Sequence, residues 1–210
     1  MDATQPTPSP PLSFTIAPAL AATYDVTVID LLRAHGCIEL VVTSAVIHQP
    51  SLSSSSSSPS PSPPRLLLIQ RAAHDAYPNV WETPGGSADP LPGVRVVAEA
   101  ARELWEETGL RATAATALVD SHTWMIDGDA ARVCLKLAFL FEVEQGGDAD
   151  GELGVVLNPD EHQSFVWVTE EEARMNRCGN VDIIWSFHNQ KDLALAAFDV
   201  QRQQQQQNKY

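Results

Sequence analysis

Three carboxylates are concentrated in one short segment of the chain, between residues 102 and 110. Glu103, Glu106 and Glu107 are spaced at i, i+3 and i+4, which places them on one face of a helix. Like charges at this spacing repel by roughly a few tenths of a kcal/mol for each pair. Carboxylate oxygens are the ligands that Mg2+ and Mn2+ prefer. The spacing therefore predicts a metal site, with a solvated acidic helix face as the alternative.

The residues around this cluster predict the helix that would present it. Apolar side chains gather on the face opposite the acidic stripe over residues 94–108. Arg102 precedes Glu106 by one turn, and this spacing favours an ion pair that fixes the direction of a carboxylate. Gly109 fits a left-handed stop at the C-terminal end. The segment is thus expected to be an amphipathic helix with an almost wholly acidic polar stripe.

These residues resemble the Nudix box, the signature of a hydrolase family, which reads G-x5-E-x7-R-E-U-x-E-E-x-G-U with U an aliphatic residue. The second half of the signature matches at every fixed position: Arg102, Glu103, Leu104, Glu106, Glu107, Gly109 and Leu110. The preceding segment from Trp81 to Gly86 resembles the family's entry into the box, and 65–71 resembles the strand before it. The resemblance runs from about residue 37 to about residue 190.

The first half of the signature departs from the family pattern. The glutamate position holds Val94 and the glycine position holds Ala88, so the double glycine stands two residues early. By resemblance, the missing glutamate supports the metal ligands more than it binds the ion. Its loss is expected to weaken ion binding without abolishing it. Asp89 and Glu99 are the candidates to compensate.

The resemblance also implies roles for the box residues and one cation, Mg2+ or Mn2+. By resemblance, Glu106 and Glu107 bind the cation directly, with the Gly85 carbonyl as a further oxygen ligand. Glu103 is either a ligand or the base that accepts the proton of water, and Arg102 orients a carboxylate. Family members often add a late acidic residue to the metal ligands. Glu161, six residues before Trp167, stands where that residue is expected, and a surface loop glutamate is the alternative.

Two further residues are candidates for contact with a substrate. Arg71 follows a strand pattern and is expected to contact a phosphate, with an ordinary strand-end arginine as the alternative. Trp81 is a candidate to stack on a base or ring, with core packing as the alternative. The histidines and cysteines show no zinc-ligand spacing, and the chain has neither a G-x-S-x-G elbow nor a phosphate-loop lysine.

Length and charge limit the partners. A chain of 210 residues suits one domain, and its net charge of −14 disfavours docking onto nucleic acid or an anionic membrane. No apolar run reaches the ~18 residues of a membrane span. The first basic residue is Arg33, which argues against a targeting peptide, and three scattered cysteines are typical of reduced thiols. These features predict a cytoplasmic protein, and they leave the oligomeric state open.

Composition divides the chain into a core and appendages. Residues 1–22 are expected to be a loose N-terminal segment, 23–200 a single domain with a disordered Ser/Pro-rich insertion at 50–64, and 201–210 a glutamine-rich tail. Strand patterns occupy 37–49, 65–71, 79–83, 113–124, 132–144 and 164–169, and helical patterns occupy 24–35, 94–108, 170–175 and 181–198. The order predicts an α/β sandwich with a mixed sheet, and the resemblance implies the α/β/α sandwich of Nudix proteins.

The expected function is metal-dependent hydrolysis of a diphosphate bond. The resemblance implies a substrate in which a nucleoside diphosphate is linked to another moiety. Two alternatives stay open: a Nudix-fold binding or regulatory module without turnover, and a hydrolase of a non-nucleotide diphosphate. An intact second half of the box favours catalysis, whereas the valine in its first half favours the module.

Overall fold

The computed structural model describes residues 13–49, 63–126, 132–145, 153–187 and 189–207. The strands are β1 (Thr15–Ile16), β2 (Leu40–Ile47), β3 (Arg65–Arg71), β4 (Trp81–Glu82), β5 (Gly85–Ala88), β6 (Ala112–Ile126), β7 (Arg132–Val143), β8 (His162–Thr169), β9 (Arg177–Cys178) and β10 (Val181–Asp182). The helices are α1 (Pro18–Tyr24), α2 (Val28–Ala34), α3 (Val96–Thr108), α4 (Glu170–Met175) and α5 (Gln190–Gln207).

The larger of the two main sheets is mixed, as expected, and the smaller one is antiparallel. One has five strands in the order β1-β6-β7-β2-β5, and the other has three in the order β4-β3-β8. Strands β2 and β7 pair in parallel over their full overlap, whereas β2–β5 and β3–β8 pair antiparallel. The antiparallel β2–β5 pairing sets Gly85 opposite Ser44 and Gly86 opposite Thr43. This register fixes the double-glycine bend at the edge of the five-stranded sheet.

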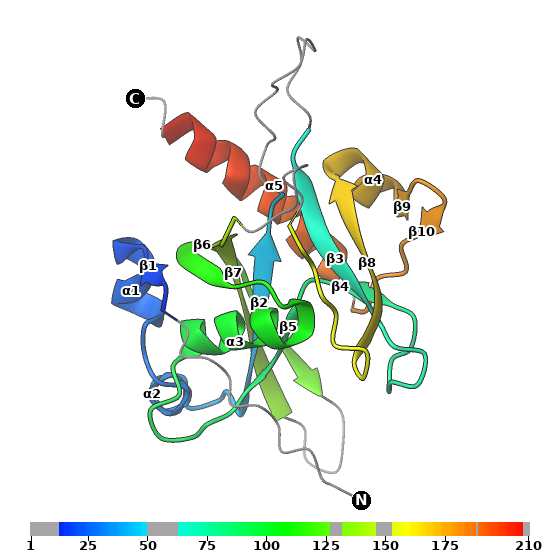
Figure 1. The fold of residues 1–210 in the computed structure, drawn as a ribbon. Helices are drawn as coiled ribbons and strands as arrows, with labels where there is room; N and C mark the ends of the chain where they lie inside the picture. Colours follow the sequence, from blue (N-terminus) through cyan, green and yellow to red (C-terminus); the bar gives the residue numbers. More distant parts are fainter. Residues whose placement is uncertain (1–12, 50–62, 127–131, 146–152, 188, 208–210) are drawn as a thin grey trace, which may run out of the picture.

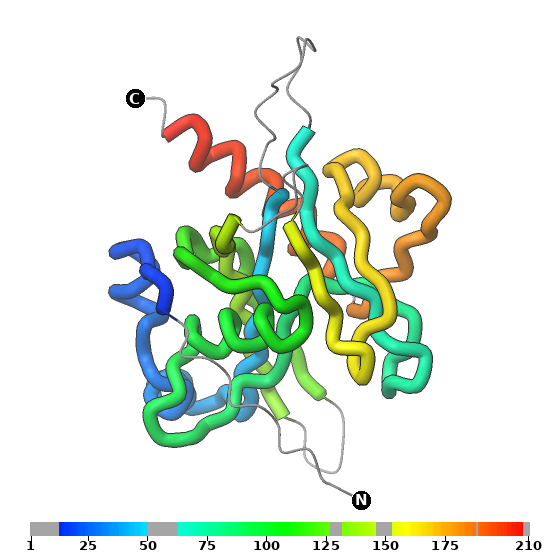
Figure 2. Tube along the Cα trace, viewed as in Figure 1, coloured from blue at the N-terminus to red at the C-terminus, as the bar shows by residue number. Residues whose placement is uncertain are grey.

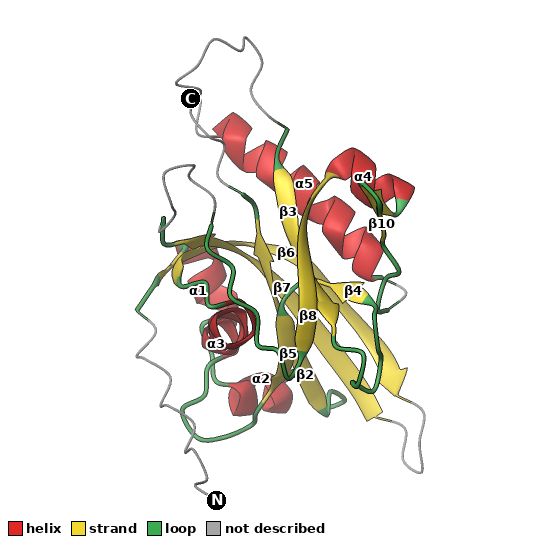
Figure 3. Ribbon diagram, turned by 45° about the vertical axis from the view of Figure 1, so that its right-hand side comes forward, coloured by secondary structure: helices red, strands yellow, loops and turns green. Residues whose placement is uncertain are grey.

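Helices cover both sides of the strands, which gives three layers. Helices α1, α2 and α3 lie on one side and α4 and α5 on the other (Figures 1 and 3). Alternate residues of β7 enter two cores: Leu137 and Phe139 join the cluster beneath α3, and Ala138 and Leu140 join the cluster beneath α5. A strand that is buried on both faces explains the almost continuously apolar sequence of β7.

The helix ends follow the sequence signals closely. Gly109 ends α3 in the left-handed conformation with a φ of 69°, and its N–H donates to the Trp105 carbonyl. Thr169 caps α4, and Glu172 completes the expected capping box. None of the helices among the described residues combines the length and apolar character needed to cross a membrane.

Several element bounds differ from those expected. Part of the N-terminal segment that was expected to be loose forms β1 and most of α1, and β1 pairs with β6. The last helix begins at Gln190 and not in the 181–189 segment, and it continues through Gln207 into the expected tail (Figure 2). Apolar spacing ends near Phe198, so hydrophobic periodicity carried no signal for the last turns. The Ser/Pro-rich insertion lies almost entirely outside the described residues.

Candidate active site

The double-glycine bend lies directly against α3. A Cβ atom added at Gly85 would lie 2.2 Å from the Thr43 carbonyl oxygen, where β5 meets β2. A Cβ atom added at Gly86 would lie 2.7 Å from the carboxyl carbon of Glu103. Position 85 needs glycine because backbone fills the space, and a side chain at position 86 would have to displace the Glu103 carboxylate. The bend and the helix are therefore built as one surface.

The three box carboxylates lie in different surroundings. Glu107 is 4% exposed and accepts a hydrogen bond from the Gly85 N–H at 2.7 Å. Glu103 is half-buried against the bend, whereas Glu106 is exposed. The carboxylates of Glu103 and Glu107 each experience repulsion from Glu161. Glu161 directly precedes β8, so the acidic groups come from two separate segments of the chain.

Arg102 holds the acidic face together. Its Nη2 atom lies 2.6 Å from Glu103 Oε1, and its Nη1 atom lies 2.5 Å from Glu106 Oε2. The Arg102–Glu106 pair is the one that the i, i+4 spacing predicted. Contact with the two carboxylates at once fixes their directions, since guanidinium donors form a rigid planar fork.

Glu99 supplies a third carboxylate to the same guanidinium. Its Oε2 atom lies 3.0 Å from Arg102 Nη2, and the side chain is only 10% exposed. Val94, at the place of the family's glutamate, instead packs against the larger core cluster. Asp89 is exposed in the loop before α3. Of the two candidates for compensation, Glu99 is therefore the one in contact with the box.

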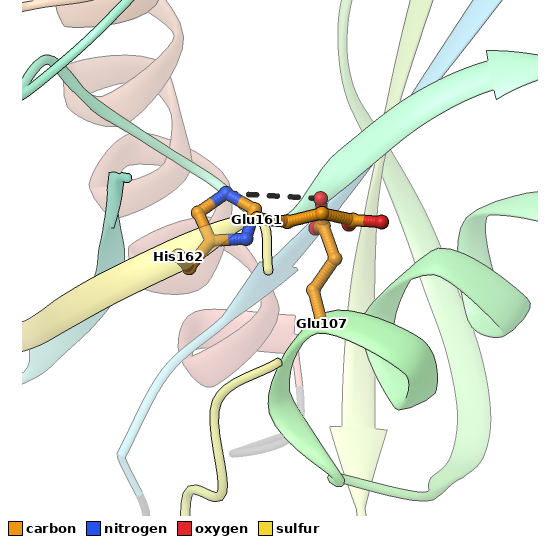
Figure 4. Close-up of side chains that lie close together, drawn as sticks. All are labelled: Glu107, Glu161 and His162. Carbon is orange, nitrogen blue, oxygen red and sulfur yellow. Dashed lines mark ion pairs between the residues drawn. The ribbon is translucent and has the colours of Figure 1, made fainter. Parts of the chain in front are cut away.

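The start of β8 brings a second group of ligands to the end of α3. Glu107, Glu161 and His162 each offer an atom for a metal ion, and these atoms lie within 4.8 Å of one another (Figure 4). The segment is held there by backbone contacts: the Asn158 N–H donates to the Glu107 carbonyl, and the His162 N–H donates to the Asn158 carbonyl. Glu161 is exposed and His162 is buried.

The electrostatics of this cluster favour a bound cation. Burial raises the pKa of Glu107 well above its usual range, and the neighbouring Glu103 raises it further. Burial also raises the pKa of Glu103, although Arg102 opposes this shift. Carboxylates that are costly to ionise in isolation are relieved by a divalent ion. The carboxylate oxygens present suit Mg2+ or Mn2+.

A buried polar layer lies behind the cluster. Glu82 is 6% exposed, and burial disfavours its charge, but the facing His162 ring and the Arg71 guanidinium together lower its pKa. Burial lowers the pKa of Lys136 to about 8, against the attraction of Glu82, Asp120 and Glu107. These groups are largely buried, and each one depends on its neighbours for compensation.

Lys136 is tied to the bend by a chain of buried hydrogen bonds. Its Nζ atom donates to Gln190 Oε1 at 2.8 Å, and Gln190 Nε2 donates to Thr83 Oγ1 at 2.8 Å. Thr83 Oγ1 lies 2.5 Å from Ser44 Oγ, and the Ser44 hydroxyl also donates to the Pro84 carbonyl. The chain thus links α5 and β7 to the residue before Gly85.

The two expected substrate contacts lie in this layer. Trp81 is 2% exposed and packs in the core beneath α5, which is the alternative to stacking that its sequence context left open. Arg71 donates to Glu82 Oε1 and to Asp75 Oδ2, each at 2.7 Å. Its contact with a phosphate stays a prediction.

The chain matches the family model for the NUDIX domain over residues 61–185. This match covers more than half of the chain and includes the bend, α3 and the Glu161 segment. The chain therefore belongs to the Nudix hydrolase family and is an enzyme of the pyrophosphohydrolase class. No curated protein sequence matches it.

Solved structures share the fold. The E. coli ORF135 protein is 24% identical with a TM-score of 0.50, and the match covers 80% of this chain and 94% of that one. The MutT protein from Methanosarcina mazei Go1 is 20% identical with a TM-score of 0.51, covering 78% and 94%. A NUDIX hydrolase from Nitrosomonas europaea is 18% identical with a TM-score of 0.50, covering 77% and 89%. The α/β/α sandwich that the resemblance implied is thereby confirmed.

Three charged or polar residues of the site region were not identified from the sequence. His162 follows Glu161 directly, so the sequence position of Glu161 could have identified His162 as a candidate ligand. Lys136 interrupts an otherwise apolar strand, and such a residue needs a buried partner. Glu82 carried no signal, because its burial against His162 depends on a segment that is distant in the sequence.

Proposed function

We propose that the chain hydrolyses a diphosphate bond in a nucleoside diphosphate linked to another moiety, with Mg2+ or Mn2+ as the cofactor. The observation that carries the proposal is the cluster of Glu107 from α3 with Glu161 and His162, beside a double-glycine bend that contacts both Glu107 and Glu103. An acidic site of this kind binds a polyphosphate when a cation lies between the two anions.

Each residue has a task in this reaction. Glu106, Glu107 and Glu161, with the Gly85 carbonyl, would hold the cation, and Arg102 keeps Glu103 and Glu106 aligned. When bound, the cation supplies positive charge to the phosphate oxygens and lowers the pKa of a water molecule. Glu103, half-buried with a raised pKa, is suited to accept the proton of the attacking water. The hydrogen bond from the Gly85 N–H holds Glu107 against the bend.

The same proposal includes the setting of the reaction. A small diphosphate is the expected partner, and the net charge of −14 argues against nucleic acid and anionic membranes. Cys37, Cys134 and Cys178 are all free thiols, which supports a reducing compartment such as the cytoplasm.

The test is a panel of nucleoside diphosphate derivatives, assayed with and without Mg2+ or Mn2+ and read by product mass. We expect metal-dependent release of two phosphorylated products. Glu103→Gln should lower kcat by about 10²-fold to 10⁴-fold, as expected for loss of a general base, while the circular dichroism spectrum is unchanged. Glu144→Gln is the matched control, because Glu144 is an exposed carboxylate at the end of β7.

The alternatives give different results in this panel. Nucleotide binding without metal-dependent product release would favour a regulatory module. Cleavage restricted to inositol or isoprenoid diphosphates, included in the same panel, would favour a non-nucleotide substrate. The contact between Glu99 and Arg102 weighs against the module, since Glu99 would supply from another position the support that Val94 does not.

A further inference from the structure

His162 is a buried imidazole whose two ring nitrogens lack a hydrogen-bond partner among the described residues. The residue is 2% exposed, so water reaches it poorly. A buried polar group without a hydrogen-bond partner is destabilising, which makes this ring an unusual feature. His162 begins β8 and follows Glu161 directly, so its ring lies beside the ion that the carboxylates would hold.

The ring is aimed at the carboxylate cluster. His162 Nε2 lies 3.8 Å from Glu107 Oε1 (Figure 4) and 3.8 Å from Glu82 Oε1. Both distances exceed hydrogen-bond length. They do fit two ligands of one ion, because atoms that each lie ~2.1 Å from a metal are at most ~4.2 Å apart. The spacing thus leaves room for an ion between the nitrogen and a carboxylate.

The negative charges of Glu82 and Glu107 are compensated by different hydrogen-bond donors. Glu82 Oε1 accepts a hydrogen bond from the cationic Arg71 guanidinium at 2.7 Å. Glu107 Oε2 accepts from a neutral backbone N–H, that of Gly85. An ion therefore gains more on the Glu107 side of the ring, and Glu161 lies on that side too.

We propose that His162 supplies an imidazole nitrogen to the same ion as Glu107 and Glu161, so that the centre binds Mn2+ in strong preference to Mg2+. The inference rests on the proposed function only in placing the ion at this cluster. Carboxylates alone suit Mg2+ and Mn2+, whereas imidazole suits transition ions and is a poor ligand for Mg2+. Loss of the ring should therefore weaken Mn2+ binding more than Mg2+ binding.

The test is electron paramagnetic resonance of the full chain loaded with Mn2+, which needs neither substrate nor turnover. Electron spin-echo modulation should show coupling to a directly bound nitrogen in the wild type. His162→Gln should abolish the coupling and raise the Mn2+ dissociation constant about tenfold or more. The Mg2+ dissociation constant, read by competition, should change by a smaller factor. His74→Gln is the matched control, because His74 is an exposed ring that hydrogen-bonds the Asp160 carbonyl, one residue before Glu161.

Labelling keeps the test decisive if His162→Gln does not fold. In wild-type protein that carries 15N-imidazole histidine, the electron spin-echo modulation of bound Mn2+ should change from the 14N pattern to the 15N pattern. Bound Mn2+ without imidazole coupling, or coupling that survives His162→Gln, would overturn the proposal and leave His162 as a packing residue. The activity panel tests the proposed function separately. Hydrolysis without nitrogen coupling would support the proposed function and reject His162 as a ligand. Nitrogen coupling without hydrolysis would support His162 as a ligand and reject the proposed function.

Discussion

The backbone N–H of Gly85 donates to the carboxylate of Glu107 at 2.7 Å, across 22 residues of sequence. This contact fixes the last turn of α3 against the edge strand β5. A carboxylate held by a single neutral donor in a buried place is poised for a positive partner. The relationship therefore connects the shape of the bend to the charge of the site.

The buried Glu107 makes metal-free stability depend on pH. Its folded-state pKa is raised well above the ordinary value of 4.5, so its stabilising contribution is present below that value and is lost as pH rises through the folded pKa. Glu107→Gln removes this loss. In urea unfolding with a chelator present, we expect the variant to gain stability relative to the wild type as pH rises above 4.5. A free-energy difference that is flat with pH would contradict the burial argument.

Glu99 is expected to perform the support that Val94 does not. In Glu99→Gln, Arg102 loses one of its charged partners and the alignment of Glu103 and Glu106 loosens. The Mg2+ concentration for half-maximal activity should rise by about tenfold, in line with outer-shell substitutions at metal sites. Asp30→Asn is the control, because it removes the exposed helical ion pair with Arg33. An identical metal titration for Glu99→Gln and wild type would rule out the compensation.

Gly86 tests how closely the bend and the helix must fit. A methyl group there would meet the flexible end of Glu103 and not backbone, so Gly86→Ala should fold while displacing that carboxylate. We expect at least about a tenfold loss in kcat/KM, since misplacement of catalytic groups by ~1 Å is costly. Gly36→Ala is the matched control, because a Cβ atom there has no neighbour within 4 Å. Equal activity of the two variants would mean that the contact is not needed.

Lys136 provides an independent check on the buried polar layer. Burial lowers its pKa from 10.5 to about 8, so the unfolded state binds more protons between these values and stability rises with pH in that window. Lys136→Met lacks this titration and leaves the Gln190 carbonyl oxygen without its donor. We expect the wild type to gain stability over the variant as pH is raised from about 8 towards 10.5. Thermal or urea unfolding across that range measures the difference.

Local patterns predicted the elements that carry the site. The acidic spacing of α3, its stop at Gly109 and the capping box of α4 depend on neighbours within a few residues, and each is confirmed. Strand β3 has the bounds expected for it. Glu161, which the family resemblance singled out, lies with Glu107 and His162 in one cluster, and its role as a metal ligand stays a prediction.

The misses share one physical cause, which is dependence on distant partners. Burial of Trp81 is decided by its packing in the cluster beneath α5, and the charge of Glu82 by Arg71 and His162. The last turns of α5 have little apolar periodicity, but Arg202 forms an ion pair with Glu170 of α4. No window of local sequence contains both Glu82 and His162, or both Glu170 and Arg202.

The assembly of the site from α3 and the opening of β8 has a consequence for biosynthesis. A nascent chain that ended at Val143 would contain every box residue that matches the family signature and still lack Glu161 and the adjoining β3–β8 pairing. Competence would therefore arrive late in synthesis, and premature termination products would be inert although they carry the diagnostic motif.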